Sequence, residues 1–391
     1  MKILSVNAGS SSLKFQMYEM PEEKVLISGV FERIGIGNSF YTIKLNGEKI
    51  KKEREVSNHE EAVKILTEEL LENKVVSSLD EIEAIGHRMV HGGDKYQTST
   101  IIDEDVIKAT EEFLDLAPIH IPANLTGVRA FQKIIPNATA VAVFDTSFHQ
   151  TLPKEAYIYP VPYEWYEKYG VRKYGFHGTS HKYVSMRMNE ILGRTDTKII
   201  TCHIGSGGSI SAVLNGKSID TSLGFTPNAG IVMGTRSGDI DALIIPFIMK
   251  KENLTISEVD NILNKKSGLL GISKKYSDSR DIEEGIKNGD ELCKLAQDIY
   301  VRRIVEYIAK YYVLLGGCDA IVMTAGVGEN SISTRKQILD KLSVLGVQID
   351  EERNNIRGEE QLITKDTSKI PVWVIPTDEE LMIAREVAKQ I

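Results

Sequence analysis

The chain has 391 residues, which is long for one hydrophobic core and typical of two domains. Its 42% hydrophobic and 26% charged residues are ordinary for a globular protein, and its net charge of -8 excludes a general nucleic-acid binder, which needs a basic face. The three cysteines are far apart in the sequence, which favours a reducing compartment. The first strand begins without an apolar leader, and the longest apolar run, 242–249, is too short to span a membrane. These features predict a cytoplasmic protein that is not bound to a membrane.

The first half alternates strand and helix patterns. Lys2 to Val6 and Leu13 to Tyr18 read as two strands around a turn of small polar residues. Further strands are predicted at 24–29, 39–45, 82–90 and 138–144, with a turn at Asn46-Gly47, and helices at 58–72, 105–116 and 124–134. Pro118 and Pro122 predict a non-helical link at 119–121. Strands that alternate with helices predict a layered α/β domain.

The strand-turn-strand pattern of the N-terminus recurs near the middle of the chain. Residues 198–204 form a strand pattern, three glycines follow, and a second strand pattern ends at Asn215-Gly216, a pair typical of a type I′ hairpin turn. Glycine lets backbone N–H groups approach phosphate oxygens closely, although the glycines of an ordinary hairpin would look the same. Because the pattern occurs twice, we predict two related domains that close on one nucleotide.

The rest of the second half continues the alternation. The segment 152–169, rich in Pro and Tyr, resists regular structure and is predicted to be the domain junction. Helices are predicted at 181–192, within 252–279, and at 290–314 and 331–342. Strands are predicted at 320–323 and 371–375, and loops at 224–241, 278–280 and 326–330. Thr377, with Glu380 three residues later, is the predicted cap of the final helix.

Several common motifs are missing from the sequence. Gly216-Lys217-Ser218 resembles the end of a P-loop, but Ser211 stands where the leading glycine belongs. No G-x-G-x-x-G follows a strand, and neither H-E-x-x-H nor G-x-S-x-G occurs. These absences argue against a dinucleotide oxidoreductase, a zinc protease and an α/β-hydrolase.

Four isolated side chains could carry chemistry, each with a plainer alternative. Arg88 and Arg236 could bind carboxylate or phosphate through the guanidinium fork, or could form a strand-end salt bridge and an ion pair with Asp239 or Asp241. Asp145, at a strand end, could serve a metal or acid-base chemistry, or could be a turn aspartate. His177, beside a glycine, could be catalytic or a structural hydrogen-bonding group.

Taken together, these segments resemble the acetate kinase family. The matching motifs follow one another from residue 2 to the last helix, and they are 7–14 (NAGSSSLK), 86–93 (GHRMVHGG), 144–149 (FDTSFH), 174–181 (YGFHGTSH), 233–241 (MGTRSGDID) and 377–380 (TDEE). The resemblance implies an α/β protein of two ribonuclease-H-like domains, the fold of sugar kinases, heat-shock chaperones and actin, with the active site in the cleft between domains. The expected domains are 1–150, completed by a helix at 380–391, and 151–379, the nucleotide-binding and dimerisation domain.

The resemblance also implies a function. It is reversible phosphoryl transfer from ATP to acetate by a homodimer, giving ADP and acetyl phosphate, with Mg²⁺ as cofactor and Mn²⁺ able to replace it. One alternative is a propionate or short-chain acyl kinase of the same family. The other, from a different class, is a nucleotide-gated chaperone or filament subunit, which has no need of Arg88, Phe176 or an apolar acyl pocket.

The family's site residues carry over to this sequence position by position. Asn7 and Glu379 resemble the magnesium site, Asp145 the catalytic acid, His177 and Arg236 the transition-state stabilisers, and Arg88 the acetate-binding residue. The acetate pocket would comprise Val90, Ile119, His120, Phe176 and Pro227. The ATP contacts would be Lys14, His203, Ile204, Gly205, Ser206, Gly207, Asp278, Ser279, Arg280, Gly326, Val327, Gly328, Glu329 and Asn330.

Three features qualify this transfer of roles. Acetate is ionised near pH 7, since carboxyl groups have pKa values of ~4, so a proton-abstracting Asp145 would be redundant and we expect it to organise Mg²⁺ instead. Ser206 stands where the family has Asn, which predicts altered nucleotide affinity. Asn228-Ala229 departs from the family beside the substrate pocket, while Val90 favours acetate because propionate-preferring members have Ala there.

Overall fold

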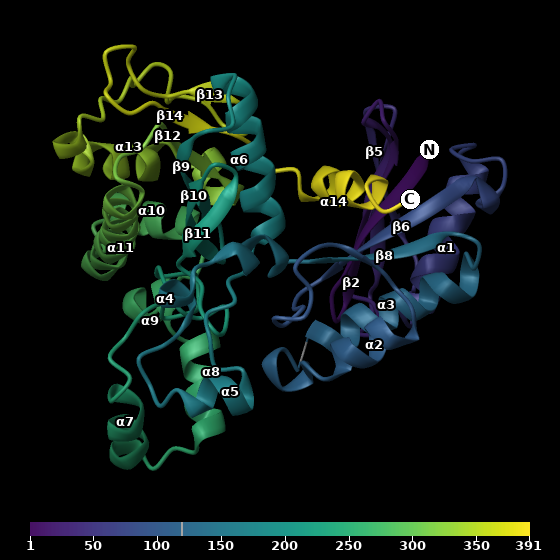
Figure 1. Cartoon of the computed structure of the whole chain (residues 1–391), viewed down its shortest axis with the longest axis horizontal. Coiled ribbons are helices and arrows are strands. Elements are labelled where there is room, and N and C mark those ends of the chain that lie inside the picture. Colours follow the sequence, from purple (N-terminus) through teal and green to yellow (C-terminus); the bar gives the residue numbers. More distant parts are fainter. Residues whose placement is uncertain (119) are drawn as a thin grey trace. The chain divides into compact units, whose positions relative to one another are not determined.

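The protein is described from a computed structural model, which covers residues 1–118 and 120–391. The chain divides into two compact units. Unit 1 comprises Met1–Phe148 and Asp378–Ile391, and unit 2 comprises His149–Thr377 (Figure 1).

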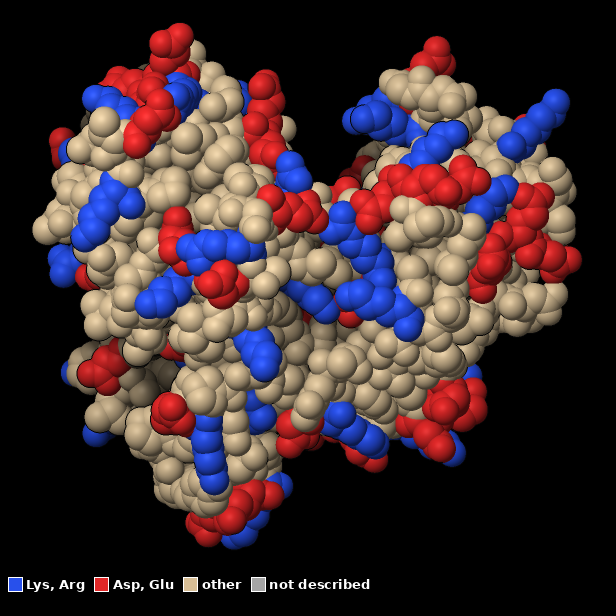
Figure 2. All heavy atoms as spheres, turned by 45° about the horizontal axis from the view of Figure 1, so that its top comes forward, with Lys and Arg blue, Asp and Glu red and all other residues tan. Residues whose placement is uncertain are grey.

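Acidic and basic side chains are mixed on the surface. Figure 2 shows Lys and Arg side chains interleaved with Asp and Glu on the viewed face. Among the described residues, no helix is both long enough and apolar enough to cross a bilayer.

Unit 1 is built on an eight-stranded mixed sheet in the order β5-β4-β3-β2-β1-β6-β8-β7. The strands are β1 (Lys2–Ala8), β2 (Ser12–Glu19), β3 (Lys24–Glu32), β4 (Phe40–Leu45), β5 (Glu48–Glu53), β6 (Ile82–Met89), β7 (Thr100–Ile101) and β8 (Thr139–Phe144). Strands β1 to β5 pair antiparallel in sequence order, and β6 and β8 run parallel to β1.

Helices cover both faces of the unit 1 sheet. The helices are α1 (His59–Glu72), α2 (Glu104–Glu111), α3 (His120–Ile134) and α14 (Glu379–Ala388), with 3₁₀ turns at Leu79–Glu81 and Leu114–Leu116; a third 3₁₀ turn, Ser147–Thr151, spans the boundary with unit 2. Successive side chains of a strand point to opposite faces. Gly86 faces Ile383 and Val387 of α14, whereas the next residue, His87, packs on Phe131 of α3. Helices α14 and α3 therefore lie on opposite faces.

Unit 2 has a six-stranded mixed sheet in the order β11-β10-β9-β12-β14-β13. Its strands are β9 (Lys198–Ile204), β10 (Gly208–Leu214), β11 (Lys217–Thr221), β12 (Ala320–Thr324), β13 (Gln361–Leu362) and β14 (Val372–Val374). Its helices are α4 (Lys154–Tyr157), α5 (Glu164–Tyr169), α6 (Gly178–Leu192), α7 (Ile244–Glu252), α8 (Ile256–Lys265), α9 (Gly268–Ser273), α10 (Ser279–Lys287), α11 (Glu291–Leu315), α12 (Ala325–Asn330) and α13 (Ile332–Lys341), with a 3₁₀ turn at Ser343–Leu345.

The two sheets share one topology. In unit 1 the antiparallel trio β3-β2-β1 continues into the parallel strands β6 and β8, and in unit 2 the antiparallel trio β11-β10-β9 continues into the parallel strands β12 and β14. This is the strand order of the ribonuclease-H-like fold, so the prediction of two related α/β domains is confirmed.

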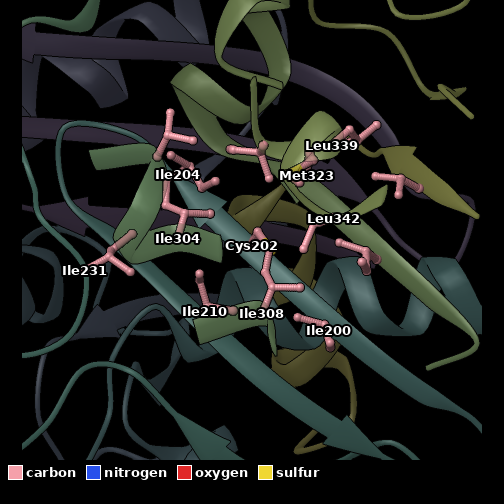
Figure 3. Packing of buried hydrophobic residues seen from close by; sticks show 14 of the residues in the cluster. Ile200, Cys202, Ile204, Ile210, Ile231, Ile304, Ile308, Met323, Leu339 and Leu342 are labelled. Atoms are coloured by element: carbon pink, nitrogen blue, oxygen red, sulfur yellow. The ribbon is translucent and has the colours of Figure 1, made fainter. Parts of the chain in front are cut away.

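The unit 2 core lies between its sheet and helices α11 and α13. Ile200, Cys202 and Ile204 alternate along β9 and pack with Ile304 and Ile308 of α11 (Figure 3). The intervening residues of β9 point to the other face, where His203 bonds Ser180 of α6. One strand therefore serves the core on one face and a polar network on the other.

The predicted hairpin turns are confirmed. Asn215 and Gly216 have φ values of 50° and 76°, and Asn46 and Gly47 have 51° and 85°. Type I′ turns require positive φ at both central residues, which is why Asn-Gly is a reliable signal.

Two helix predictions in unit 1 were wrong in extent. The link predicted as non-helical at 119–121 is helical over its described residues His120 and Ile121, because Pro122 falls in the first turn of α3, where a missing N–H costs nothing. Ile119 lies outside the described residues. The helix predicted at 105–116 ends at Glu111, and a 3₁₀ turn follows.

Four local predictions in unit 2 and at its end were also wrong. The segment 326–330 is helix α12 rather than a loop, and Ser279 and Arg280 form the first turn of α10 with Asp278 as its cap. The segment 152–169 contains α4 and α5. The final helix is capped by Asp378, whose carboxylate accepts from Leu381 N at 2.9 Å, and not by Thr377.

Candidate functional site

Three polar side chains of unit 1 meet at one edge of its sheet. Asn7 lies near the end of β1, Arg88 near the end of β6, and Asp145 directly after β8. These strands are parallel neighbours, so their carboxyl ends share an edge, which is where α/β sheets bind ligands.

Arg88 binds both of its neighbours at this edge. Its Nε and Nη2 donate to the two carboxylate oxygens of Asp145 at 3.2 and 2.5 Å, and its Nη1 donates to Asn7 Oδ1 at 3.3 Å. Burial disfavours the charge of Arg88, but the carboxylates of Asp145 and Glu379 outweigh burial and raise its pKa. The strand-end salt bridge weighed from the sequence is therefore present. A guanidinium has five N–H groups, so two remain for a ligand.

A second acidic group stands beside this pair. Glu379 begins helix α14, and burial together with the negative charge of Asp145 raises its pKa to about 7. Lys14, predicted as a phosphate contact, forms an ion pair with Glu380 at 2.5 Å, and its side chain is 55% exposed.

The unit 1 part of the predicted acetate pocket is held by a residue that sequence reasoning missed. Asn124 of α3 accepts a hydrogen bond from Val90 N at 3.0 Å and donates to Ala8 O at 2.9 Å. It thus ties the ends of β1 and β6 together. Val90 is buried, and His120 is the exposed first residue of α3. Nothing in the sequence pattern separates Asn124 from any other helical asparagine.

Unit 2 holds a cavity of about 530 Å³ formed by segments that are far apart in the sequence. Its lining includes eight of the predicted ATP-binding residues, Gly205, Ser206, Asp278, Ser279, Arg280, Gly326, Val327 and Asn330. It also includes residues that sequence reasoning missed, Gly234, Leu269, Ser277, Glu283, Tyr300, Ser331 and Arg357. The volume is within the range of small-molecule sites.

Two predicted ATP residues act behind the cavity wall. The Glu329 carboxylate accepts from Ala325 N at 2.8 Å and from Thr377 N at 3.1 Å, so it holds helix α12 to the last residue of unit 2. Gly328 O accepts from the buried Arg335 at 3.1 Å. These contacts position the wall of the cavity.

Arg236 and His177 both approach Gly207, in the turn between β9 and β10. A Cβ atom built on Gly207 would lie 3.7 Å from Arg236 Nη1 and 3.7 Å from His177 Nε2. His203, at the end of β9, stacks on His177 with ring centroids 4.2 Å apart. Phe176, next to His177, is buried, and its carbonyl lies 3.0 Å from His149 Nε2.

The ion pair considered for Arg236 does not form. Its Nη1 donates to Pro227 O at 3.0 Å. The two aspartates bind other groups: Asp239 accepts from Gly230 N and from the Tyr307 hydroxyl, and Asp241 accepts from Leu243 N. Within residues 1–118 and 120–391, no carboxylate pairs with this guanidinium. Burial lowers its pKa. A half-buried arginine without a protein counterion is suited to an anionic ligand.

The family comparison decides between the kinase and the other nucleotide-binding proteins of this fold. A model described as the acetokinase family matches residues 2–385. This chain belongs to the acetokinase family. Acetate kinase of Bacillus velezensis is 54% identical to this chain over 390 residues, 99% of each chain, and acetate kinase of Bacillus subtilis is 53% identical with the same coverage.

Solved structures agree at the level of the whole fold. Acetate kinase of Porphyromonas gingivalis matches this acetokinase with a TM-score of 0.94 and 46% identity over 99% of each chain. A propionate kinase of Francisella tularensis matches with a TM-score of 0.94 and 42% identity over the full length of each.

Ser206 and Asn228, two positions interpreted from the sequence as departures from the family pattern, both lie in loops of the predicted site. Ser206 lies in the cavity wall, and its carbonyl accepts from Gly234 N at 2.9 Å. Asn228 donates to Leu263 O at 2.9 Å and accepts from Ser237 Oγ at 2.9 Å. Asn228 therefore fixes the loop that carries both Pro227 and Arg236 against helix α8.

Proposed function

We propose that the chain is an acetate kinase that transfers a phosphoryl group reversibly between ATP and acetate, with the ATP phosphates beside Gly207. The observation that carries this proposal is that the guanidinium of Arg236, which has no carboxylate partner among the described residues, approaches Gly207 together with His177 Nε2. Phosphoryl-transfer catalysis consists mainly of positioning and of stabilising charge on the equatorial oxygens, and these two groups suit that task.

Arg88 is the proposed acetate-binding residue. Its two remaining N–H groups can bind a second carboxylate while Asp145 holds the rest of the fork. Val90 and Phe176 are the apolar residues proposed to surround the methyl group, and we propose that both units serve one reaction. Holding acetate in place matters because two anionic reactants must approach each other.

The residues around Arg88 fit a magnesium ion. Mg²⁺ favours carboxylate and amide oxygens together with substrate phosphates. Asn7, Asp145 and Glu379 supply such oxygens, and burial together with the negative charge of Asp145 raises the pKa of Glu379 to about 7. Within the described residues, no cluster of three or more His, Cys, Asp or Glu side chains could hold a metal ion. The bound ion would neutralise charge on the phosphates, and Mn²⁺ offers the same coordination.

Hydroxamate formation tests the activity. The protein is incubated with ATP, Mg²⁺ and hydroxylamine, with acetate or with no acid. We expect hydroxamate only with acetate, because acetyl phosphate is trapped as it forms. ATP hydrolysis that does not depend on acid would instead identify the chaperone or filament class.

The same assay measures acyl-chain preference. We expect propionate to react more slowly than acetate by about 10- to 200-fold in kcat/KM, since one methylene in an apolar pocket is worth ~1–3 kcal/mol. The similarity to a propionate kinase supports propionate as the alternative substrate. Equal or faster reaction of propionate would assign the chain to that substrate class.

We further propose a cytoplasmic homodimer that associates through helices α7 and α8 of unit 2. The three cysteines are free thiols, as a reducing compartment requires. Large apolar side chains are exposed on and before these helices, with Leu243 74%, Phe247 59% and Ile256 61% exposed. Apolar groups that gather on a surface in this way mark interfaces.

Phe247→Asp should convert the dimer to a monomer, because a carboxylate would then be buried without a partner in the interface. Light scattering after size exclusion measures the mass. Val344→Asp, at a site that is 87% exposed, is the matched control and should leave the dimer intact. A Phe247→Asp variant that stays dimeric would exclude this surface.

A further inference from the structure

A row of buried hydroxyl and imidazole groups lies behind His177 in unit 2. Thr201 Oγ1 is 2.7 Å from His181 Nδ1, His181 Nε2 is 2.7 Å from Ser209 Oγ, and Ser209 Oγ is 2.8 Å from His177 Nδ1. Thr201, His181 and Ser209 have no exposed surface. The row therefore runs from strand β9 through α6 and β10 to the residue that faces Gly207.

The direction of the hydrogen bonds follows from the first member of the row. Within the part of the chain that the structure describes, the contact with His181 is the one hydrogen bond of the Thr201 hydroxyl. A buried hydroxyl proton without an acceptor is costly. Thr201 therefore donates its proton to His181 Nδ1.

The remaining protons are then determined one after another. Burial holds the pKa of His181 well below its ordinary value, so the ring is neutral and carries a single proton. Since Nδ1 accepts from Thr201, the proton is on Nε2, and Nε2 donates to Ser209. The single Ser209 proton is left for His177 Nδ1, which therefore accepts.

We propose that Thr201, His181 and Ser209 fix the tautomer of His177, so that its neutral ring carries the proton on Nε2, the nitrogen that faces Gly207 and Arg236. The inference rests on the function proposed above for His177 and assigns these three as positioning residues. In this tautomer Nε2–H can donate to a phosphoryl oxygen without prior protonation. In the other tautomer Nε2 would present a lone pair to negatively charged oxygens.

The tautomer can be measured directly in the unmodified protein. Two-bond ¹⁵N–¹H correlation spectra of protein labelled at histidine distinguish protonated from bare ring nitrogens, and the His177→Asn variant assigns the His177 signals. We expect Nε2 to be protonated and Nδ1 to be bare in both His177 and His181. A neutral His177 or His181 with its proton on Nδ1 would overturn the inference.

Variants of Ser209 test the consequence for turnover. Ser209→Ala should lower kcat about 10- to 100-fold, the effect seen at metal sites when the hydrogen-bond partner behind a functional histidine is lost, and leave the KM for ATP within about twofold. Ser209→Thr keeps the hydroxyl and should restore most of kcat. The matched control is Ser211→Ala, two residues along the same strand, where the lost hydroxyl bonds Thr221 instead and kcat should stay unchanged.

The outcomes separate this inference from the proposed function. Unchanged kcat in Ser209→Ala, together with a large loss in His177→Asn, would refute the positioning role alone. Unchanged kcat in His177→Asn would refute the catalytic role of His177, while the spectra would still decide the tautomer.

Discussion

Replacing Arg236 by Ala should lower kcat by ~10³-fold or more, the effect expected when an arginine that stabilises the transferring phosphoryl group is lost. The KM for ATP should change only modestly, because the cavity that is proposed to bind the nucleotide has its own walls at Gly205, Asp278 and Asn330. Steady-state kinetics with ATP and acetate varied separately measure both quantities.

Two further variants make this result specific. Arg236→Lys keeps the charge but loses the fork that donates to Pro227 O, so it should recover only part of kcat. Arg302→Ala removes an arginine on α11 that is 77% exposed and should leave kcat unchanged. Comparable turnover in Arg236→Ala and the native protein would remove Arg236 from the mechanism.

Replacing Arg88 by Ala should impair both acetate use and stability. Asp145 is 1% exposed and would lose its only cationic partner among the described residues, and an unpaired buried charge costs roughly 3–5 kcal/mol. The two N–H groups proposed for acetate would also be lost. We expect a KM for acetate raised about 100-fold or more and a lower melting temperature, measured by kinetics and calorimetry.

The double variant Arg88→Met with Asp145→Asn separates these two effects. It removes both charges and should recover most of the stability while acetate use stays lost. Arg129→Ala, which breaks an exposed pair with Glu104, is the control and should leave the melting temperature nearly unchanged, because exposed ion pairs contribute little to stability. A native KM for acetate in Arg88→Ala would require another carboxylate-binding residue.

Features of the fold were predictable where a short sequence pattern is compatible with a single local structure. Asn215-Gly216 and Asn46-Gly47 require positive φ, and the repeated strand-turn-strand pattern identified two related domains. Pro122 led to the wrong prediction of a non-helical link, because a proline disrupts the interior of a helix but is tolerated in its first turn. Thr377 and Asp378 are both capable caps, and only the geometry of Leu381 N selects the aspartate.

Residues of the site were predictable only where they belong to a motif shared with the family. Tyr300 and Arg357 line the cavity but come from a long helix and a distant loop, and no spacing in the sequence links them to Gly205. The role of Asn228 in holding the Arg236 loop depends on a contact with Leu263, 35 residues away. Such residues are brought together by tertiary packing, which periodicity does not report.

The placement of helix α14 has a consequence for how the protein is made. Ile383 and Val387 face Gly86 of β6, so the sheet begun by the first residues is covered on one face by the last. At ~5–20 residues per second on the ribosome, the 243 residues from 149 to 391 take roughly 10–50 seconds to synthesise. The part of unit 1 that is made first therefore waits, with one apolar face of its sheet open to solvent and to chaperones, until the last residues of the chain emerge.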